Sequence, residues 1–326
     1  MCGGAGFIGS DFVRRMLAKH DDWSAVVYDK LTYAGNLENL ESIQPDSRYS
    51  FVQGCIYDAA AVAAALDEHG PVDAIVNFAA ETHVDRSIVH PESFLRTDIF
   101  GTHTLLEAVR ERDIGKFVQV STDEVYGSID AGSFCETDRL HPSNPYSASK
   151  AGGDLQVLAH HATYGTPVLI TRGSNTYGAH QYPEKLIPLF VTNALEGEKL
   201  PLYGDGLNVR DWLHVNDHAD GIEAALLHGK PGQVYNIGGG NERTNREITE
   251  IILDELGFDW DGTVRQVEDR PGHDRRYSID CDRAHRLLGW EPTMDFESGL
   301  RETIRWYRDN ESWWYKTKHA EGESPE

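Results

Sequence analysis

The chain has 326 residues and a formal net charge of −23, because 53 acidic residues outnumber 30 basic ones. Proteins that bind nucleic acid neutralise its phosphates with a positive surface, so this composition excludes a basic nucleic-acid binder. Its 40% hydrophobic and 25% charged residues are typical of a globular protein. A prior of roughly 150 residues per domain suggests about two domains.

The sequence also lacks the signals of a membrane or exported protein. No stretch approaches the roughly 18 consecutive apolar residues of a membrane span, and no basic segment followed by an apolar run opens the chain. The four cysteines lie far apart without a CxxC pair, so neither a disulfide framework nor a zinc ribbon is indicated. We expect a cytoplasmic protein that does not bind membranes.

The acidity is combined with a shortage of lysine, which supplies only nine of the 30 basic residues. Many carboxylates with few lysines are typical of a protein kept soluble at high salt, where charge repulsion is screened over short distances. We therefore hypothesise a saline cytoplasm, and the alternative is an ordinary acidic enzyme.

Short apolar and β-branched runs alternate with helical patterns through the first half of the chain. This alternation predicts βαβ units and a parallel sheet, that is, a doubly wound α/β fold. After about residue 173 the alternation becomes irregular, which suggests a smaller second α/β domain. The expected strands are 25–28, 49–52, 74–78, 116–120, 167–170 and 233–237.

A GxxGxxG loop formed by Gly3, Gly6 and Gly9 precedes the first helical pattern. Glycine lets the backbone turn tightly and approach a pyrophosphate, which binds the amide groups at the start of the helix. Asp29 ends the next expected strand, 20 residues after Gly9, where a carboxylate can bind a ribose diol. We expect NAD rather than NADP, because Asp29 would repel a 2′-phosphate, although the adjacent Lys30 weakens this inference.

A dinucleotide-binding fold has a central strand directly before such a loop, and here only Met1 and Cys2 precede Gly3. Each apolar side chain of a buried strand contributes roughly 1.5–3 kcal/mol, so the whole strand is comparable with the ~5–15 kcal/mol net stability of a domain. We therefore expect that the first strand of the sheet is truncated.

Tyr146 and Lys150 lie at positions i and i+4, on one face of a helix that Asn144 and Pro145 can start. An ammonium near a phenol favours the phenolate, so we expect Lys150 to lower the pKa of Tyr146. Tyr146 would then be a usable base near neutral pH.

Three polar residues, Thr122, Asp123 and Glu124, follow the expected strand 116–120. The carboxyl ends of parallel strands face the crevice where ligands bind in open α/β sheets. A helix cap or a solvated turn is the alternative interpretation of this triplet. Together with the glycine loop and the Tyr146–Lys150 pair, the triplet predicts a catalytic site.

On these motifs the chain resembles the extended short-chain dehydrogenases/reductases, and among them the family of the dTDP-glucose 4,6-dehydratases. The Thr-Asp-Glu triplet is the specific feature, because epimerases of the same superfamily share the glycine loop and YxxxK but usually lack the acidic pair. The similarity covers nearly the whole chain, in the segments 3–10, 29–36, 78–87, 121–127, 146–150, 171–178, 183–188, 203–212 and 270–277.

The resemblance implies a Rossmann-type NAD-binding domain formed by residues 1–172 and 211–237. It also implies a smaller nucleotide-sugar-binding domain formed by residues 173–210 and 238–326. We expect a homodimer formed through the helix around 104–112 and the helix that carries Tyr146 and Lys150.

The resemblance also implies a chemistry. Tyr146, assisted by Lys150, would take the proton of the sugar 4-hydroxyl while a hydride passes to NAD, and Thr122 would hydrogen-bond the same oxygen. Glu124 would remove the carbon 5 proton, and protonated Asp123 would deliver a proton to the leaving 6-hydroxyl. The hydride would return to carbon 6 and give a 4-keto-6-deoxy sugar. These roles require that the pKa values of the two carboxyls differ.

Binding residues are carried over from the family in the same way. The cofactor set, besides Tyr146 and Lys150, is Gly3, Gly6, Phe7, Ile8, Gly9, Asp29, Lys30, Thr32, Gly35, Cys55, Ile56, Ala79 and Ala80. The substrate set is Thr82, Asn175, Glu184, Lys185, Leu186, Arg210, Asn245, Arg270, His273 and Tyr277. Because the substrate carries a diphosphate, we expect a positive pocket formed by Lys150, Lys185, Arg210, Arg270, Arg275 and Arg276.

Some positions depart from the family pattern. Cys55 stands where the family usually has an aspartate that contacts the adenine amino group, and Asp98 replaces a usual asparagine. Gly173, Thr176 and Ala179 replace a cysteine, an asparagine and a proline. None of these changes removes a catalytic group, but Cys55 puts the adenine contact in doubt.

Two alternative functions stay open at this point, a nucleotide-sugar 4-epimerase and an inactive NAD-binding homologue. The epimerase shares the oxidation step, and the inactive homologue would explain the short start and Cys55. His214 and His218 lie at i and i+4, but no HExxH pattern surrounds them. We therefore expect no metal site.

Overall fold

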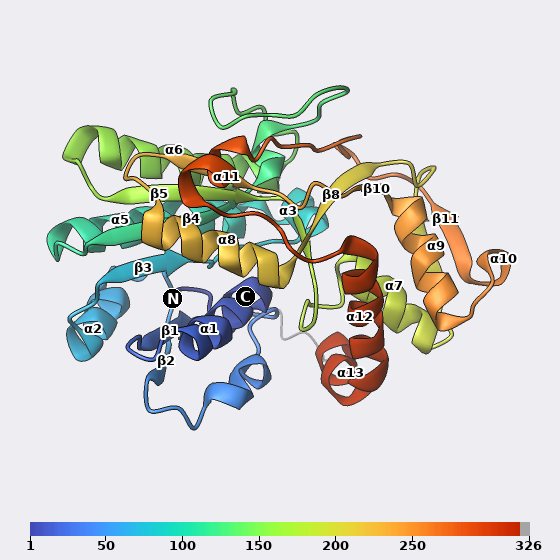
Figure 1. The fold of residues 1–326 in the computed structure, drawn as a ribbon, viewed down its shortest axis with the longest axis horizontal. Helices are drawn as coiled ribbons and strands as arrows, with labels where there is room; N and C mark the ends of the chain where they lie inside the picture. The colour runs from blue at the N-terminus through green and yellow to red at the C-terminus, as the bar shows by residue number, and fades with distance from the viewer. Residues whose placement is uncertain (320–326) are drawn as a thin grey trace.

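The computed structural model describes residues 1–319, and a six-stranded parallel arrangement forms its centre. Figure 1 shows strands β3, β4 and β5 at the core of the larger part of the molecule. The strands are parallel in the order β2-β1 and β3-β4-β5-β9. This confirms the predicted α/β fold. Their bounds are β1 (Ala25–Asp29), β2 (Tyr49–Gln53), β3 (Ala74–Asn77), β4 (Lys116–Thr122), β5 (Val168–Gly173) and β9 (Val234–Ile237).

Met1 and Cys2 lie between β1 and β3 and join the two groups of strands. Cys2 forms isolated parallel bridges with Tyr28 and with Asn77. The Cys2 amide donates to the Val76 carbonyl at 3.0 Å. These two residues therefore occupy the place of the first strand, and the longer strand that we expect there stays a prediction.

Helices cover both faces of this sheet, as a parallel sheet requires. On one face α2, α5 and α6 pack through a cluster that includes Leu106, Phe117 and Val157. On the other face α1, α8 and α11 pack through Phe12, Ile222 and their neighbours. The bounds of these helices are α1 (Phe7–Lys19), α2 (Ala59–His69), α5 (Thr102–Glu111), α6 (Pro145–Tyr164), α8 (Val215–His228) and α11 (Asp282–Leu288).

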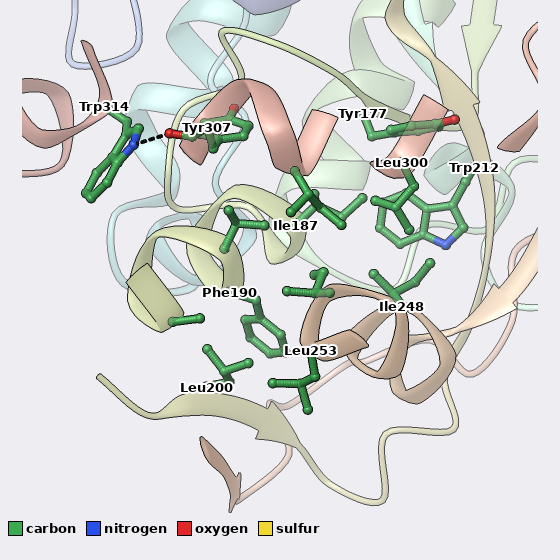
Figure 2. Packing of buried hydrophobic residues seen from close by; sticks show 14 of the residues in the cluster. Tyr177, Ile187, Phe190, Leu200, Trp212, Ile248, Leu253, Leu300, Tyr307 and Trp314 are labelled. Carbon is green, nitrogen blue, oxygen red and sulfur yellow. Dashed lines mark hydrogen bonds between the residues drawn. The ribbon is translucent and has the colours of Figure 1, made fainter. Parts of the chain in front are cut away.

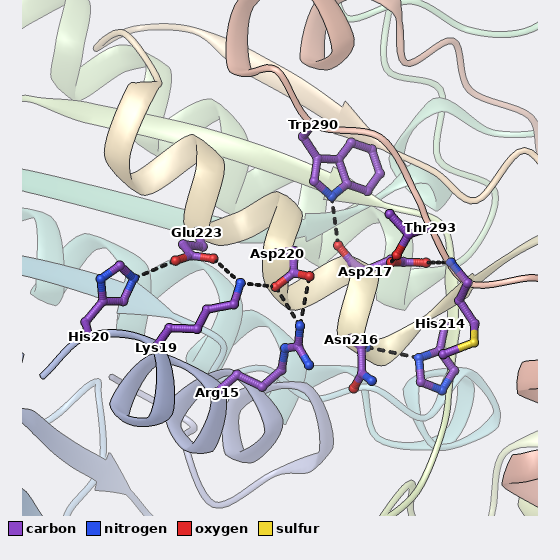
Figure 3. Close-up of polar contacts among 11 residues, drawn as sticks. Arg15, Lys19, His20, His214, Asn216, Asp217, Asp220, Glu223, Trp290 and Thr293 are labelled. Atoms are coloured by element: carbon purple, nitrogen blue, oxygen red, sulfur yellow. Dashed lines mark hydrogen bonds and ion pairs between the residues drawn. The ribbon is translucent and has the colours of Figure 1, made fainter.

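Ion pairs join α1 to α8 along the surface of this face (Figure 3). Arg15 donates to both oxygens of Asp220 at 2.8 Å. Lys19 bridges Asp220 and Glu223 at 2.6 Å. Because α1 starts at the glycine loop, these contacts fix α8 relative to that loop.

The remaining elements form a second part, on the right of Figure 1. Strand β8 pairs with β6 in parallel and with β10 in antiparallel orientation, and β7 pairs with β11. Helices α7, α9, α12 and α13 enclose a cluster that includes Phe190, Ile248, Leu300 and Trp314 (Figure 2). The bounds are β6 (Asn175–Tyr177), α7 (Leu186–Leu195), β7 (Leu200–Tyr203), β8 (Val209–His214), β10 (Glu242–Thr244), α9 (Asn245–Leu256), α10 (Trp260–Thr263), β11 (Val264–Val267), α12 (Phe296–Asp309) and α13 (Glu311–His319).

Short helical segments surround the sheet edge between these two parts. They are η1 (Leu37–Ile43), α3 (Val84–Val89), α4 (Pro91–Phe94), η2 (Leu95–Gly101) and η3 (Asp123–Tyr126). Within residues 1–319 no helix is both long and apolar enough to cross a bilayer. The predicted domain boundaries stay a prediction, and residues 320–326 of the second domain lie outside the described residues.

A buried ion pair attaches α6 to the sheet. Arg172 of β5 donates to the Asp154 carboxylate of α6 at 2.9 Å, and both side chains are almost fully buried. Arg172 also donates to the hydroxyl of Tyr126 at 2.8 Å. Since α6 carries Tyr146 and Lys150, this pair holds the catalytic helix against the strands.

We predict that Asp154→Asn lowers the free energy of unfolding by about 3 kcal/mol, because it leaves the charge of Arg172 buried without a counter-charge. Urea denaturation measures this change. The control is Glu250→Gln, which breaks the exposed pair between Arg246 and Glu250 and should cost about 0–1 kcal/mol. Equal small losses in the two variants would contradict the role of the buried pair.

Candidate active site

A cavity opens at the carboxyl ends of the parallel strands, where the sequence places the ligand site. Every residue of the predicted cofactor set except Lys150 lines it. Of the predicted catalytic and substrate residues, Thr122, Asp123, Glu124, Tyr146, Thr82, Asn175, Glu184 and Lys185 also line it.

The glycine loop forms the floor of this cavity because its backbone packs closely on the sheet. Gly3 has a φ of +72°, and a Cβ at this position would lie 2.5 Å from the amide nitrogen of Ala79. A Cβ at Gly9 would lie 2.4 Å from the Gly3 carbonyl oxygen. Gly6 caps α1 in an extended conformation without a side-chain hydrogen bond. The first amides of α1 are therefore directed at the cavity and can bind a pyrophosphate.

Asp29 is fixed at the end of β1 by two backbone hydrogen bonds. Its Oδ2 accepts from the amide of Ala5 at 3.0 Å, and its Oδ1 accepts from the amide of Leu31 at 2.8 Å. Burial raises the pKa of Asp29, and these two bonds oppose that rise. Each carboxylate oxygen keeps acceptor capacity for a ribose hydroxyl.

The wall next to Asp29 contains Cys55, the position that departs from the family pattern. The hydroxyl of Tyr28 donates to the Cys55 carbonyl at 3.1 Å. Gly54 allows this contact, because a Cβ there would lie 2.3 Å from that hydroxyl. Tyr28 and Gly54 line the cavity as well, and no motif in the sequence singled them out.

The polar triplet lies where β4 ends, and its middle residue is the most buried. Asp123 is 3% exposed; its Oδ1 accepts from the Thr122 hydroxyl at 3.3 Å and its Oδ2 has no partner. Burial, Glu124 and Asp211 together raise the pKa of Asp123 well above its ordinary value. Asp123 can therefore hold a proton at neutral pH, as a general acid must.

Lys150 and Tyr146 lie as predicted on one face of α6, which Asn144 caps by accepting from the Ser147 amide at 2.9 Å. The Lys150 ammonium is buried and donates to the Val120 carbonyl at 2.8 Å. The expected net lowering of the pKa of Tyr146 is not found. Burial, with the nearby charges of Glu124 and Asp98, raises the pKa of Tyr146 well above its ordinary value.

Asp98 lies behind these two residues, on the π-helical segment η2. It is 1% exposed and accepts from the Ser149 hydroxyl. Burial raises the pKa of Asp98 to about 7, although Lys150 and Ser149 favour its charged form.

The predicted substrate residues divide into two groups. Lys185 donates to the Thr82 carbonyl, and Glu184 accepts from the hydroxyl of Tyr33 at 3.0 Å. These residues line the cavity together with Asn175. The other group does not line it: Leu186, Arg210, Asn245, Arg270, His273 and Tyr277.

Arg210 and Tyr277 lie behind the catalytic carboxylates. The Arg210 guanidinium is 4.3 Å from the centre of the Tyr277 ring and donates to the Asp274 carbonyl at 2.9 Å. The Tyr277 hydroxyl lies 2.7 Å from an Asp274 oxygen and 3.4 Å from a Glu124 oxygen. This group therefore supports Glu124 from the second part of the molecule.

The remaining members of that group contact other surfaces. The Arg270 guanidinium lies 4.0 Å from Asp85, and His273 Nδ1 lies 2.6 Å from Asp269. Leu186 starts α7 and packs against the cluster of Figure 2. The amide of Asn245 donates to the Asn208 carbonyl at 3.1 Å.

Of the six members of the predicted positive pocket only Lys185 lines the cavity, and two of the others are held in ion pairs elsewhere. Arg275 pairs with Asp205 at 2.8 Å, and Arg276 pairs with Glu242 at 2.6 Å. Neither lines the cavity. Their charge is used in ion pairs, which the sequence could not reveal because Asp205 and Glu242 lie more than thirty residues away.

The sequence missed several residues of the cavity wall. Their contribution depends on contacts between distant segments; for example, the Arg86 guanidinium lies 3.8 Å above the ring of Tyr33. In the sequence, His218 is distinguished only by its i, i+4 spacing from His214. Gly173 and Thr176, which the sequence marks as departures from the family pattern, line the cavity, and the missed lining residues are Tyr28, Tyr33, Ala34, Gly54, Phe78, Glu81, Thr97, Val120, Ser174, Gln181, Tyr182 and His218.

One group of metal-ligand types comes together in residues 1–319, away from this cavity. His103 and Glu107 of α5 and His160 of α6 have ligand atoms within 4.8 Å of one another. Glu107 already pairs with Arg110 at 2.5 Å and lies 3.4 Å from His160. The expected absence of a metal stays a prediction.

Comparisons with known proteins agree with this geometry. A family profile described as GDP-mannose 4,6 dehydratase matches residues 1–303. A dTDP-glucose 4,6-dehydratase from Streptomyces antibioticus is 52% identical over 321 residues, which cover 97% of this chain and 94% of that protein. A crystal structure of dTDP-glucose 4,6-dehydratase from Streptomyces venezuelae with NAD bound is 54% identical, with a TM-score of 0.94, and the match covers 97% of this chain and 98% of that one.

The epimerases are more distant. A UDP-glucuronic acid 4-epimerase from Bacillus cereus, crystallised with UDP-glucuronic acid and NAD, is 26% identical with a TM-score of 0.86. That match covers 94% of this chain and 98% of the epimerase.

We predict that Asp123 is protonated at neutral pH. Its raised pKa places the loss of the proton at higher pH than for an ordinary aspartate. An infrared difference spectrum between the wild type and Asp123→Asn should therefore contain a protonated-carboxyl band, which disappears as the pH rises. Asp205→Asn is the control, because Arg275 holds the pKa of Asp205 at about 2 and only carboxylate bands should change. A carboxylate signature for Asp123 at neutral pH would contradict the assignment.

Proposed function

The chain belongs to the GDP-mannose 4,6-dehydratase family within the NAD-dependent epimerases and dehydratases, and from this membership we propose its activity. It is an NAD-dependent hydro-lyase, a nucleotide-sugar 4,6-dehydratase that acts on dTDP-glucose. The product is dTDP-4-keto-6-deoxyglucose. Curated relatives named dTDP-glucose 4,6-dehydratase support this substrate at 50–52% identity over nearly the whole chain.

The observation that carries the proposal is the acidic pair at the end of β4. Asp123 and Glu124 are adjacent and both line the cavity, yet only Asp123 is almost fully enclosed. Elimination of water needs one group that accepts a proton and one that donates a proton at neighbouring carbons. Burial gives Asp123 the donor role, and Glu124 takes the acceptor role.

The other groups perform the oxidation step. When bound, NAD accepts the hydride of carbon 4, returns it to carbon 6 and adds a positive charge beside the site. Tyr146 receives the proton of the 4-hydroxyl, and Thr122 hydrogen-bonds the same oxygen. Because burial raises the pKa of Tyr146, its phenolate depends on nearby positive charge. Lys150, held on the Val120 carbonyl, supplies part of that charge.

The binding residues follow from where each group lies. The glycine loop and Asp29 receive the pyrophosphate and the adenine ribose, and Cys55 and Ile56 lie beside the adenine. Thr82, Asn175, Glu184 and Lys185 receive the sugar and its diphosphate. Arg210, Arg270, His273, Asn245 and Tyr277 bind the nucleotide end in this proposal, and none of them lines the cavity.

The carboxyl pair also separates this proposal from the epimerase alternative. A 4-epimerase oxidises and reduces the same carbon, so it needs no acid for a leaving hydroxyl. A buried acid at the cavity wall such as Asp123, whose pKa is raised by burial, is not required for such a reaction.

We infer that the enzyme is a homodimer in the cytoplasm and binds neither nucleic acid nor membranes. We place the dimer surface on α6, as expected, and on α3 and η2 rather than on the expected helix 104–112, because the exposed apolar side chains lie on these elements. The four cysteines are free, as in a reducing compartment. The exposed side chains are Ile88, Val89, Leu95, Phe100, Leu155 and Tyr164.

Incubation with dTDP-glucose should yield a product that has lost one water, measured by mass spectrometry. Glu124→Gln and Asp123→Asn should each lower kcat by roughly 10²–10⁴-fold, because each removes one proton-transfer group. Both variants should retain NAD. Asp123→Asn should still exchange the carbon 5 proton with deuterated solvent, whereas Glu124→Gln should not. A product of unchanged mass with an inverted carbon 4 would establish the epimerase instead, and near-normal turnover in either variant would overturn the assigned roles.

We predict that Leu155→Asp converts the dimer to a monomer, because it places a charge in an apolar interface. Leu155 is 57% exposed on α6. Light scattering coupled to size exclusion measures the mass. Leu287→Asp on α11, a leucine that is 52% exposed, is the control and should leave the dimer intact. A wild type that is already monomeric would refute the proposed interface.

A further inference from the structure

His218 presents an unused hydrogen-bond acceptor to the cofactor cavity. The residue lies on α8 and is 2% exposed, yet it lines the cavity beside Gly173 and Thr176. Its Nε2 is buried and has no hydrogen-bond partner. A buried nitrogen that stays unpaired costs free energy, so a ligand group that satisfies it would be bound more tightly.

The contacts of Thr176 decide which tautomer His218 adopts. The Thr176 hydroxyl donates to the Ser174 carbonyl at 3.2 Å, so its single proton is already used. Its oxygen lies 2.8 Å from His218 Nδ1, and we assign the proton of this contact to Nδ1 because the hydroxyl donates to Ser174. Burial lowers the pKa of His218 to about 4, so the ring is neutral. The lone pair consequently lies on Nε2, the atom without a partner.

The position of the ring shows which part of the cofactor can reach it. Gly173 is the register partner of Thr122 on the neighbouring strand. A Cβ at Gly173 would lie 2.6 Å from His218 Nε2. The nitrogen is therefore one strand away from the catalytic hydroxyl, at the reactive end of the cavity, whereas Asp29 and Cys55 mark the adenosine end.

We propose that His218 is a cofactor-positioning residue whose Nε2 accepts a hydrogen bond from the carboxamide amino group of the nicotinamide. The carboxamide is the one donor that the reactive ring of NAD carries. Phosphates carry only acceptors at neutral pH, and the adenosine donors lie at the other end of the cofactor. The hydroxyls of the nicotinamide ribose are the other donors near the ring, and the analogue used in the experiment below retains them. This contact fixes the rotation of the nicotinamide and therefore the face that it presents to sugar carbon 4.

Two departures from the family pattern are explained together by this arrangement. Any side chain at position 173 would displace the imidazole, and Thr176 supplies the hydroxyl that sets its tautomer. The helix that carries His218 cannot readily move, because Asp220 and Glu223 on α8 pair with Arg15 and Lys19 on α1 (Figure 3).

The experiment compares NAD⁺ with its 3-acetylpyridine analogue, in which a methyl ketone replaces the carboxamide and no amino donor remains. Equilibrium binding to the full chain is measured by calorimetry without any sugar, so the result does not depend on the proposed reaction. The wild type should prefer NAD⁺ by roughly tenfold, the value of one buried hydrogen bond to an otherwise unpaired group.

His218→Leu should abolish this preference, and His218→Gln, which places an amide oxygen near the position of Nε2, should restore most of it. His285→Leu is the matched control, since His285 Nε2 is also unpaired but lies outside the cavity; it should keep the wild-type preference. Melting temperatures identify variants that fail to fold. A preference that is unchanged in His218→Leu would overturn the proposal, as would an equal loss of affinity for NAD⁺ and for the analogue.

Discussion

A parallel sheet covered by helices on both faces leaves one region where polar side chains can gather without disturbing a core. That region is the edge at which all the strands end, and the contents of the cavity follow from it. Asp29 ends β1, the catalytic triplet ends β4 and Gly173 ends β5. The second part of the molecule closes this edge with Glu184 and Lys185, so the site has walls from both parts.

Enclosure of this edge then sets the protonation states on which the chemistry depends. Removal of water penalises every charged form, which raises the pKa of Asp123, Tyr146 and Asp98 and lowers that of His218. Burial thereby favours the protonated forms of Asp123 and Asp98, opposes the phenolate of Tyr146, and keeps one imidazole as an acceptor. The same physical effect therefore produces a general acid, a base that needs positive charge beside it, and an unpaired nitrogen that suits an amide donor.

Local patterns predicted most of the fold and the half of the site that lies on consecutive residues. The six strands, the glycine loop, Asp29 and the triplet 122–124 depend on short-range periodicity or on fixed spacing, and the structure confirms their positions. Contacts between distant segments could not be predicted. Tyr277 reaches Glu124 from 153 positions away, and Arg275 is bound by Asp205 rather than by a ligand. The rise in the pKa of Tyr146 was missed because i, i+4 spacing reveals the nearby ammonium but not the burial.

The net charge of −23 affects both the ion pairs of the surface and the number of cations that the cavity contains. The 53 acidic residues outnumber the 30 basic ones, so one cation can have several carboxylate neighbours. Arginine pairs with several carboxylates more readily than lysine because its guanidinium group has five N–H donors. Arg301 shows the result, since it pairs with Asp254, Glu255 and Glu297. Cations used in this way are not available to the cavity, and Arg275 and Arg276 are lost from it for that reason. Because the amides at the start of α1 receive the pyrophosphate of NAD, the cation of the cavity wall that remains for an anionic substrate is Lys185, which donates to the Thr82 carbonyl and lies 3.9 Å from Glu184.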